Sequence, residues 1–190
     1  MQQYLDLLKT IKEKGTYKAP AREGMPGTLS LFGYQFRHDL SKGFPLITTK
    51  KLSFKNIVVE LSWFMKGYTN IKYLIDNGCN IWNEDAYNYY LKQIGKSPDG
   101  SYHLKPMSFE QFVDRIKNPQ GESRVESLSY KLGDCGVQYG GLMRNLKVVD
   151  ANGGMTYVDQ LKDLIIGLRK NPESRRHIIN NWNIGTLNDM

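Results

Sequence analysis

A run of apolar residues at helical spacing lies between Ser53 and Lys66 and gives the strongest periodic signal in the chain. Its members are Phe54, Ile57, Val58, Leu61, Phe64 and Met65. Ser53 can cap the first turn of this helix, and Gly67 can end it. A helix with so wide an apolar face has to bury that face against other elements. We therefore expect a packed core, for which 190 residues with 40% hydrophobic side chains are sufficient.

Further helices and two strands follow from the same kind of reading. The helical patterns run from Tyr4 to a stop at Gly15, from Asn70 to Asn77, through Tyr87, Tyr90 and Leu91, from a capping box at Ser108, and from a cap at Thr156 to a stop at Asn171–Pro172. Strand patterns occupy Thr28–Arg37, with a kink expected at Gly33, and His177–Trp182. The order lacks regular βαβ alternation. It predicts an α+β fold in which helices cover a mixed sheet.

One segment, residues 95 to about 132, interrupts this pattern. Its first part is polar and marked by Gly and Pro, and its capping box at Ser108 opens a single amphipathic helix. The segment is too short to build a core of its own. We expect one domain over residues 1–190, with a peripheral insertion at about 95–132.

Charge, cysteines and motifs exclude several classes of protein. The formal net charge is +7, but Lys and Arg are scattered, so small anionic partners are expected rather than nucleic acid. Cys79 and Cys135 form no CxxC pair, and His38, His103 and His177 are isolated from one another, which argues against a disulfide scaffold or a metal site. The absence of GxGxxG and P-loop motifs argues against Rossmann and NTPase folds.

The amino-terminal residues Met1–Asp6 lack a basic region followed by an apolar run. No stretch of the sequence approaches the length of a membrane span. We expect a cytoplasmic protein with no membrane partner.

Paired arginines are the first candidate for a binding site. Arg175 and Arg176 stand between a helix-stopping proline and a β-branched run. Two adjacent guanidinium groups can present paired hydrogen-bond donors to a phosphate.

Glu60 and Trp82 are candidates with competing interpretations. Glu60 projects onto the edge of the apolar stripe, where partial desolvation would suit a general acid. The alternative is a surface-edge glutamate paired with Lys55 or Lys66. Trp82 can be a core residue, or it can offer a flat face to a planar ligand. The sequence pattern alone leaves both questions open.

Several segments together resemble the thymidylate synthase family. They are Gly27–Gly33, Gly43–Lys51, Glu60–Phe64, Thr69–Ile71, Asn80–Trp82 and the stretch from Pro172 to Met190. The matches occur in order from Tyr4 to the last residue and are interrupted only by the 95–132 segment. The resemblance implies reductive methylation of dUMP to dTMP, with 5,10-methylenetetrahydrofolate as co-substrate and no metal, in a homodimer.

The resemblance also assigns roles to individual residues. It implies that Arg22, Arg175 and Arg176 bind the dUMP phosphate, the last two by reaching across the dimer interface. Glu60 is implied as the residue that organises water and proton transfers, and Tyr139 as the tyrosine near the nucleophile. The implied folate contacts are Ile81, Trp82, Glu60 and Ser53.

Five positions differ from the residues usual in the family, and they are Glu23, Ser53, Tyr68, Asp85 and Met143. Glu23 adds a negative charge beside the loop arginine, whereas Ser53, Tyr68, Asp85 and Met143 replace the usual His, Asp, Trp and Trp. Affinity for folate is therefore the inherited property most open to change.

The nucleophilic cysteine of the family follows a segment like Gly185–Met190 and is absent from these 190 residues, so the fold is expected to be incomplete at the carboxyl end. Cys135 stands where the family has an apolar residue and is not expected to replace it. We expect the 190 residues alone to be inactive. Two alternatives stay open: a dUMP or dCMP hydroxymethylase of the same fold, and a non-catalytic truncated subunit that donates Arg175 and Arg176 in trans.

Overall fold

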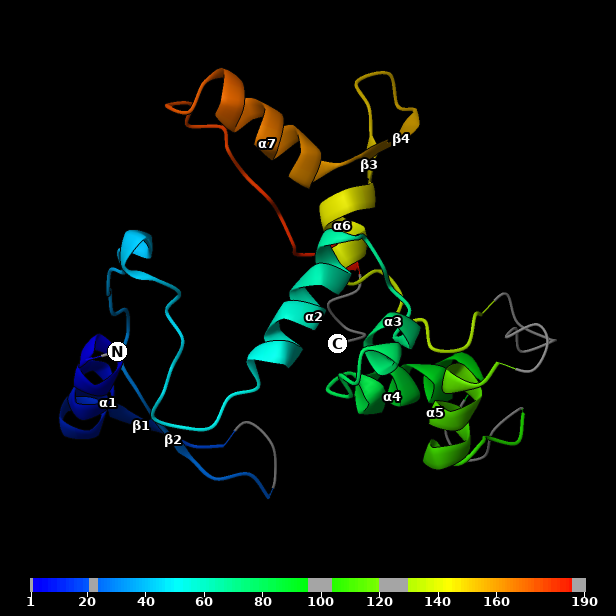
Figure 1. The fold of residues 1–190 in the computed structure, drawn as a ribbon, viewed down its shortest axis with the longest axis horizontal. Helices are drawn as coiled ribbons and strands as arrows, with labels where there is room; N and C mark the ends of the chain where they lie inside the picture. The colour runs from blue at the N-terminus through cyan, green and yellow to red at the C-terminus, as the bar shows by residue number, and fades with distance from the viewer. Residues whose placement is uncertain (1, 21–23, 96–103, 120–129, 186–190) are drawn as a thin grey trace. The chain divides into compact units, whose positions relative to one another are not determined.

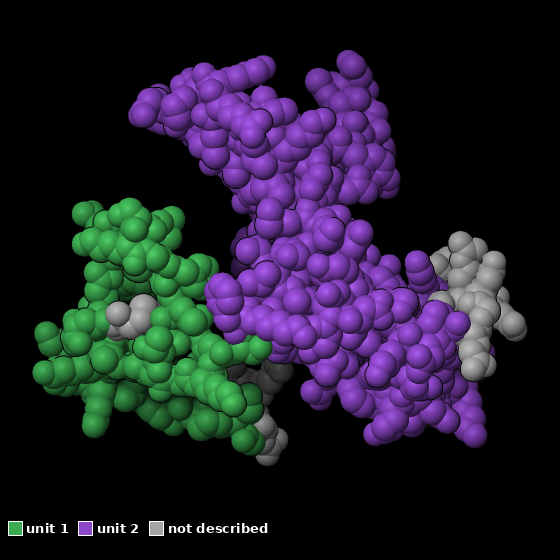
Figure 2. Space-filling view, viewed as in Figure 1, with its two compact units in different colours: residues 1–53 green, residues 54–190 purple. Residues whose placement is uncertain are grey.

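The computed structural model describes residues 2–20, 24–95, 104–119 and 130–185. Backbone contacts divide the chain into two compact units, residues 1–53 and residues 54–190 (Figure 2). The expectation of a single domain over residues 1–190 stays a prediction.

A helix and a short hairpin form the first unit (Figure 1). Helix α1 spans Gln2–Lys14, and strand β1 (Thr16–Lys18) pairs antiparallel with β2 (Thr28–Ser30). A 3-10 turn, η1, follows at Leu40–Lys42. The amide of Gly15 donates to the carbonyl of Ile11 at 2.8 Å where α1 ends. The first predicted helix is therefore confirmed.

The strand predicted over Thr28–Arg37 is much shorter than expected. Only Thr28–Ser30 pairs, because β1 offers three residues and no more. Gly33 has a φ of 77°, a left-handed conformation that turns the chain away from the strand direction. The kink expected at Gly33 is thus present, but the residues beyond it find no strand partner among those described.

The second unit is mainly helical in its described residues. Its helices are α2 (Phe54–Met65), α3 (Lys72–Asp76), α4 (Asn83–Gln93), α5 (Phe109–Lys117), α6 (Tyr139–Asn145) and α7 (Gln160–Lys170) (Figure 1). Gly67 ends α2 with a φ of 72°. Ser108 opens α5 through the predicted capping box with Gln111. The helices predicted from α2 to α5 are confirmed.

Helix α6 was not predicted, because Gly140 and Gly141 lower the helix propensity of its sequence. Packing explains the first of them. A Cβ atom at Gly140 would lie 2.7 Å from the carbonyl oxygen of Tyr68, so only glycine lets α6 approach the chain just beyond α2.

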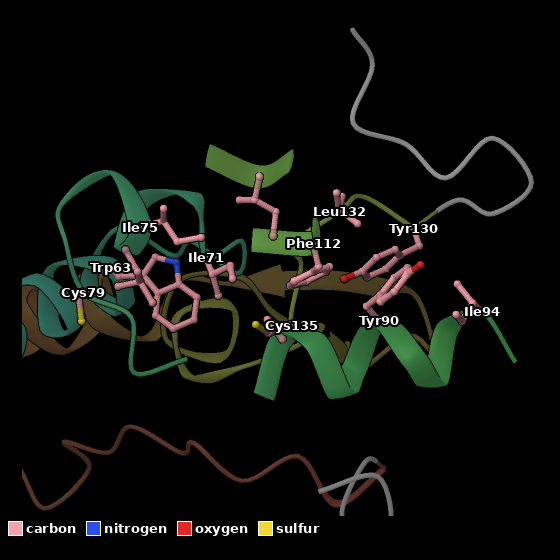
Figure 3. Packing of buried hydrophobic residues seen from close by; sticks show 13 residues of the cluster. Trp63, Ile71, Ile75, Cys79, Tyr90, Ile94, Phe112, Tyr130, Leu132 and Cys135 are labelled. Atoms are coloured by element: carbon pink, nitrogen blue, oxygen red, sulfur yellow. The ribbon is translucent and has the colours of Figure 1, made fainter. Parts of the chain in front are cut away.

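The core of the second unit surrounds Trp63, which is fully buried (Figure 3). Its indole Nε1 donates to the carbonyl oxygen of Asn70 at 2.9 Å. The cluster also contains Ile71, Leu74, Ile75, Cys79, Ala86, Tyr90, Ile94, Phe112, Ile116, Tyr130, Leu132 and Cys135. Phe112 and Ile116 belong to the predicted insertion, whose described part therefore shares this core.

The packed face of α2 coincides only in part with the expected one, because Phe64 of the predicted stripe packs against the core. Phe54, Val58, Leu61 and Met65 belong to the predicted stripe, yet their side chains are 45–51% exposed. Trp63, outside the stripe, is the buried residue of the helix. Helical periodicity identified an apolar face, but it could not say which face has neighbours.

The helix expected to be capped by Thr156 is capped three residues later, at Asp159. Thr156 lies in strand β4 (Met155–Val158), which pairs antiparallel with β3 (Leu146–Val149). Asp159 is the actual cap of α7, because its carboxylate accepts a hydrogen bond from the amide of Lys162 at 3.0 Å.

The strand expected at His177–Trp182 is not formed. Among the described residues no strand lies beside this segment, and Asn180 pairs instead with the side chain of Gln160. The α+β class is confirmed, although the strands described form two separate antiparallel pairs instead of one helix-covered sheet. In the described part of the chain, no helix has the length and apolar character needed to cross a membrane.

Candidate functional site

Aromatic rings from three helical segments meet beside the core of the second unit. Trp82 precedes α4, Phe64 lies on α2 and Tyr139 begins α6. The ring centroids of Phe64 and Tyr139 are 5.2 Å apart, and those of Trp82 and Tyr139 are 6.5 Å apart, both edge to face. Trp63 underlies the group, at 5.4 Å from Trp82. These contacts fix the ring planes.

Glu60 faces this aromatic group. It lies one helical turn before Phe64, and the indole Nε1 of Trp82 donates to its Oε1 at 2.6 Å. Glu60 is half-buried, so the surface pairing with Lys55 or Lys66 that the sequence allowed is not the arrangement found. No hydrogen bond to its second carboxylate oxygen is found within the described chain. One carboxylate oxygen is therefore held by the indole.

Tyr139, a member of this group, and Ile81, the residue before Trp82, both have exposed side chains. The Tyr139 side chain is 44% exposed, and Ile81, next to Trp82, is 50% exposed. The structure thus brings together Glu60, Trp82 and Tyr139, three of the residues that the sequence singled out, and Ile81 precedes Trp82 in the sequence.

An ion pair that the sequence analysis did not predict lies between α6 and the cap of α7. Arg144 at the end of α6 donates from Nε to both carboxylate oxygens of Asp159, at 2.9 and 3.0 Å. Its Nη1 donates to the carbonyl oxygen of Met65 at 2.6 Å. Arg144 therefore links the end of α2 to the cap of α7. Recognising Asp159 as the cap would have revealed one half of this pair.

The Arg144–Asp159 pair has an electrostatic signature. Burial by itself raises the pKa of Asp159, but the hydrogen bonds from Arg144 and from the Lys162 amide outweigh it, so that this pKa lies below its ordinary value. The carboxylate form is the one that the fold stabilises.

The arginine pair lies elsewhere in the second unit, in the turn after α7. Arg175 and Arg176 are exposed, and within the described chain their guanidinium groups make no hydrogen bond or ion pair. No contact in that part of the chain joins them to Glu60 or Trp82. Two unpaired guanidinium groups next to each other are suited to bind an anion from solution.

Two other candidates lie outside the described part of the second unit. Arg22, together with Glu23, lies outside the described residues. Ser53 is exposed and belongs to the first unit. Their assigned roles stay predictions.

Both cysteines are unsuited to nucleophilic attack. Cys79 and Cys135 are free thiols buried in the core. Burial, with smaller contributions from Asp134 and Asp85, raises the pKa of Cys135 to about 12. A thiol with this pKa is protonated at neutral pH.

The described histidines have local structural roles. His38 bonds through Nε2 to the carbonyl oxygen of Gly43 at 2.8 Å, and His177 to that of Asn171 at 2.9 Å. His103 lies outside the described residues. In the described part of the chain, no group of His, Cys, Asp and Glu side chains is arranged to hold a metal ion.

Comparisons of this chain with a family profile and with individual proteins lead to the same family. A family profile described as thymidylate synthase matches residues 2–190. Proteins named thymidylate synthase from Mycoplasma mobile and Mycoplasma pneumoniae are 45% and 42% identical to all 190 residues, which cover 57% and 58% of those relatives. One from Listeria innocua is 41% identical over 198 residues, with all of this chain and 61% of the relative covered. The chain thus spans about three fifths of the length of these relatives.

Proposed function

The chain belongs to the thymidylate synthase family, and from this membership we propose that it serves the reductive methylation of dUMP to dTMP. The co-substrate is 5,10-methylenetetrahydrofolate, which supplies both the carbon and the hydride. The proposed reaction uses no metal ion.

The observation that carries the proposal is the contact between Glu60 and Trp82 beside Tyr139. The half-buried carboxylate, held by the indole at 2.6 Å, is suited to organise water and move protons around a pyrimidine. Trp82 and Ile81 provide an apolar surface for the folate rings. Tyr139 borders the place where the nucleophile acts. The hydrogen bond between Glu60 and Trp82 and the ring contact between Trp82 and Tyr139 support three of these assignments, and Ile81 is assigned from the family resemblance alone.

Phosphate binding is assigned to the arginines. The exposed, unpaired guanidinium groups of Arg175 and Arg176 support a role in gripping the dUMP phosphate, together with Arg22. In a homodimer the pair serves the site of the partner subunit. Such sharing makes dimer formation a condition for nucleotide binding.

Tritium release provides the test of the proposed reaction. The full-length protein is incubated with dUMP tritiated at C5 and with 5,10-methylenetetrahydrofolate, and tritium is expected in water only when the folate is present. The mass of the nucleotide product separates dTMP from a hydroxymethyl nucleotide, and therefore separates the synthase from the hydroxymethylase. Failure to release tritium from labelled dUMP under any condition contradicts the synthase and the dUMP hydroxymethylase.

A polypeptide limited to these 190 residues is proposed to lack turnover. Both of its thiols are buried, and C6 attack by a thiolate is the step that makes C5 reactive. The same tritium assay on this polypeptide is expected to show no release above background. Release that depends on folate would contradict the proposal.

The exposure of the arginine pair favours one further role, in which this chain supplies Arg175 and Arg176 to the phosphate site of another, intact subunit. The 190-residue chain is mixed with an intact family member whose own equivalent arginines are replaced. Restored tritium release, lost again when Arg175 and Arg176 of this chain are changed to Ala, is the expected result. No rescue at any mixing ratio would exclude this role.

A further inference from the structure

The loop that carries the arginine pair folds back onto the end of α7. The carbonyl oxygen of Asn171, the residue after this helix, accepts the amide of Ser174 at 3.1 Å and Nε2 of His177 at 2.9 Å. The amide of Arg176 donates to Oγ of Ser174 at 3.2 Å. Both arginines therefore lie inside a short closed loop, between two groups that bind the same carbonyl.

His177 closes this loop by fitting against α7. A Cβ atom at Gly167 would lie 3.1 Å from Cε1 of the His177 ring, so glycine at this helix position gives the ring its place. A carbonyl oxygen only accepts hydrogen bonds, and this requires the Nε2 atom of His177 to carry a proton. The ring is a donor anchored on the helix end.

Gln160 fixes the chain on the other side of His177. Its Nε2 donates to the carbonyl oxygen of Asn180 at 2.9 Å, and its Oε1 accepts the amide of Asn180 at 2.9 Å. This two-bond pairing resembles one step of a strand ladder, supplied by a side chain. Nε2 of Gln160 also donates to the carbonyl oxygen of Leu142 at 2.8 Å. This third bond links Gln160 and Asn180 to α6.

We propose that Gln160 and His177 are positioning residues, which clamp the loop of Arg175 and Arg176 at two points so that both guanidinium groups are held ready for an anion. A loop ordered in advance spares the ligand the entropic cost of ordering it. Gln160 and His177 themselves need not touch the ligand. The inference deepens the proposed function and rests on it in taking the phosphate of dUMP as the anion.

Four variants of the full chain test the clamp. His177→Ala removes the ring donor, and His177→Gln keeps a donor at a similar distance from the backbone. Gln160→Met keeps the length of the side chain but removes all three of its hydrogen bonds. His38→Ala is the matched control, because His38 makes the same ring-to-carbonyl contact, with Gly43 at 2.8 Å.

Two readouts are combined. Calorimetric titration with dUMP and with deoxyuridine, which lacks the phosphate, measures the role of the arginines in binding. Amide hydrogen exchange at Ser174 and Asn180 measures closure of the loop directly. The Arg175→Ala and Arg176→Ala variants show whether dUMP binding depends on these arginines at all.

The His177→Ala and Gln160→Met variants are expected to raise the Kd for dUMP about tenfold, roughly the effect of losing one well-placed hydrogen bond. The Kd for deoxyuridine is expected to stay unchanged, and exchange of the nearby amides to accelerate. His177→Gln is expected to restore most of the dUMP affinity, and His38→Ala to behave as wild type.

Three results would overturn the clamp. One is faster exchange with an unchanged Kd for dUMP, and another is an equal loss of affinity for dUMP and deoxyuridine. The third is unchanged exchange at both amides in both variants. If wild type binds dUMP no better than deoxyuridine, or the arginine variants bind dUMP as wild type does, the phosphate assignment itself fails, and the exchange data alone then decide whether the loop is clamped.

Discussion

Glu60 shows how the sequence can give the position of a side chain on a helix but not its partner. The helical wheel placed this carboxylate at the edge of an apolar stripe, which is a local property. Its hydrogen bond with Trp82 spans 22 residues of sequence and depends on how α4 meets α2. Helical periodicity contains no information about how these two helices pack against each other. The position of Glu60 on the helix could be predicted, but its hydrogen bond could not.

Two variants separate the charge of Glu60 from its hydrogen bond. Glu60→Gln still accepts from Trp82 but loses the carboxylate, so we expect kcat to fall by about 10²–10⁴-fold, the usual contribution of a general acid or base. Trp82→Phe keeps an aromatic ring but loses the donor, and a smaller loss of about tenfold is expected. Tritium release from C5 of dUMP by the full-length protein measures both.

Glu13→Gln is the control for these variants, because Glu13 is an exposed residue of α1 that faces only Lys9, at 4.0 Å. Its activity is expected to equal that of wild type. A Glu60→Gln enzyme that turns over as fast as this control would remove Glu60 from the proposed chemistry.

Cys135 supports a prediction about thiol reactivity at the same scale. With a pKa of about 12, about one Cys135 in ten thousand is a thiolate at pH 8, and burial blocks access to it. In the folded 190-residue polypeptide we expect Ellman's reagent to modify neither cysteine, and both to react after addition of guanidinium chloride. Rapid modification of Cys135 without denaturant would contradict the buried position.

At the scale of elements, helix ends that depend on residues within one turn were predicted correctly. Predictions that depend on strand pairing were wrong. The capping box at Ser108 and the stop at Gly67 act within one helical turn, and both ends were predicted. Thr156 and Asp159 are both good caps, and the choice between them depends on whether residues 155–158 pair with β3. The run after Arg176 is β-branched, but a strand also needs a neighbour, and Gln160 occupies that role for Asn180. Which cap or hydrogen-bond partner a segment uses depends on the packing of the whole fold and not on the sequence of that segment alone.

The Arg144–Asp159 pair predicts how the contact between α6 and α7 responds to acid. Because the pKa of Asp159 is lowered in the folded state, the stability that it contributes is present above its ordinary pKa of 3.8 and is lost as the pH falls through the folded value. Asp159→Asn keeps a good capping residue and removes the charge. We expect it to lower the free energy of unfolding at pH 7 by less than about 1 kcal/mol, since the pair is partly exposed.

Urea unfolding at pH 7 and at pH values below 3.8 measures this effect. The gap between wild type and Asp159→Asn is expected to close in acid, whereas Asp6→Asn, an exposed change on α1, should show no gap at either pH. A gap that stays constant across the range would show that the charge of Asp159 does not stabilise the fold.

For the whole molecule, net charge and exposed apolar surface have opposing effects. The formal charge of +7 keeps copies of the chain apart by repulsion at neutral pH. The half-exposed stripe of Phe54, Val58, Leu61 and Met65 on α2 favours association, because burial of apolar area is favourable. Solubility of the 190-residue polypeptide therefore depends on the balance of these two terms.

That balance can be shifted in either direction. Raising the pH towards the sequence pI of about 9.3 removes the repulsion, and we expect light scattering to show association beyond a dimer that is absent at pH 7 and low salt. Leu61→Lys places a charge in the middle of the stripe and is expected to suppress this association. Gln3→Lys adds the same charge on an exposed position of α1 and should suppress it much less. If the two variants act equally, net charge alone controls the solubility and the stripe has no part in it.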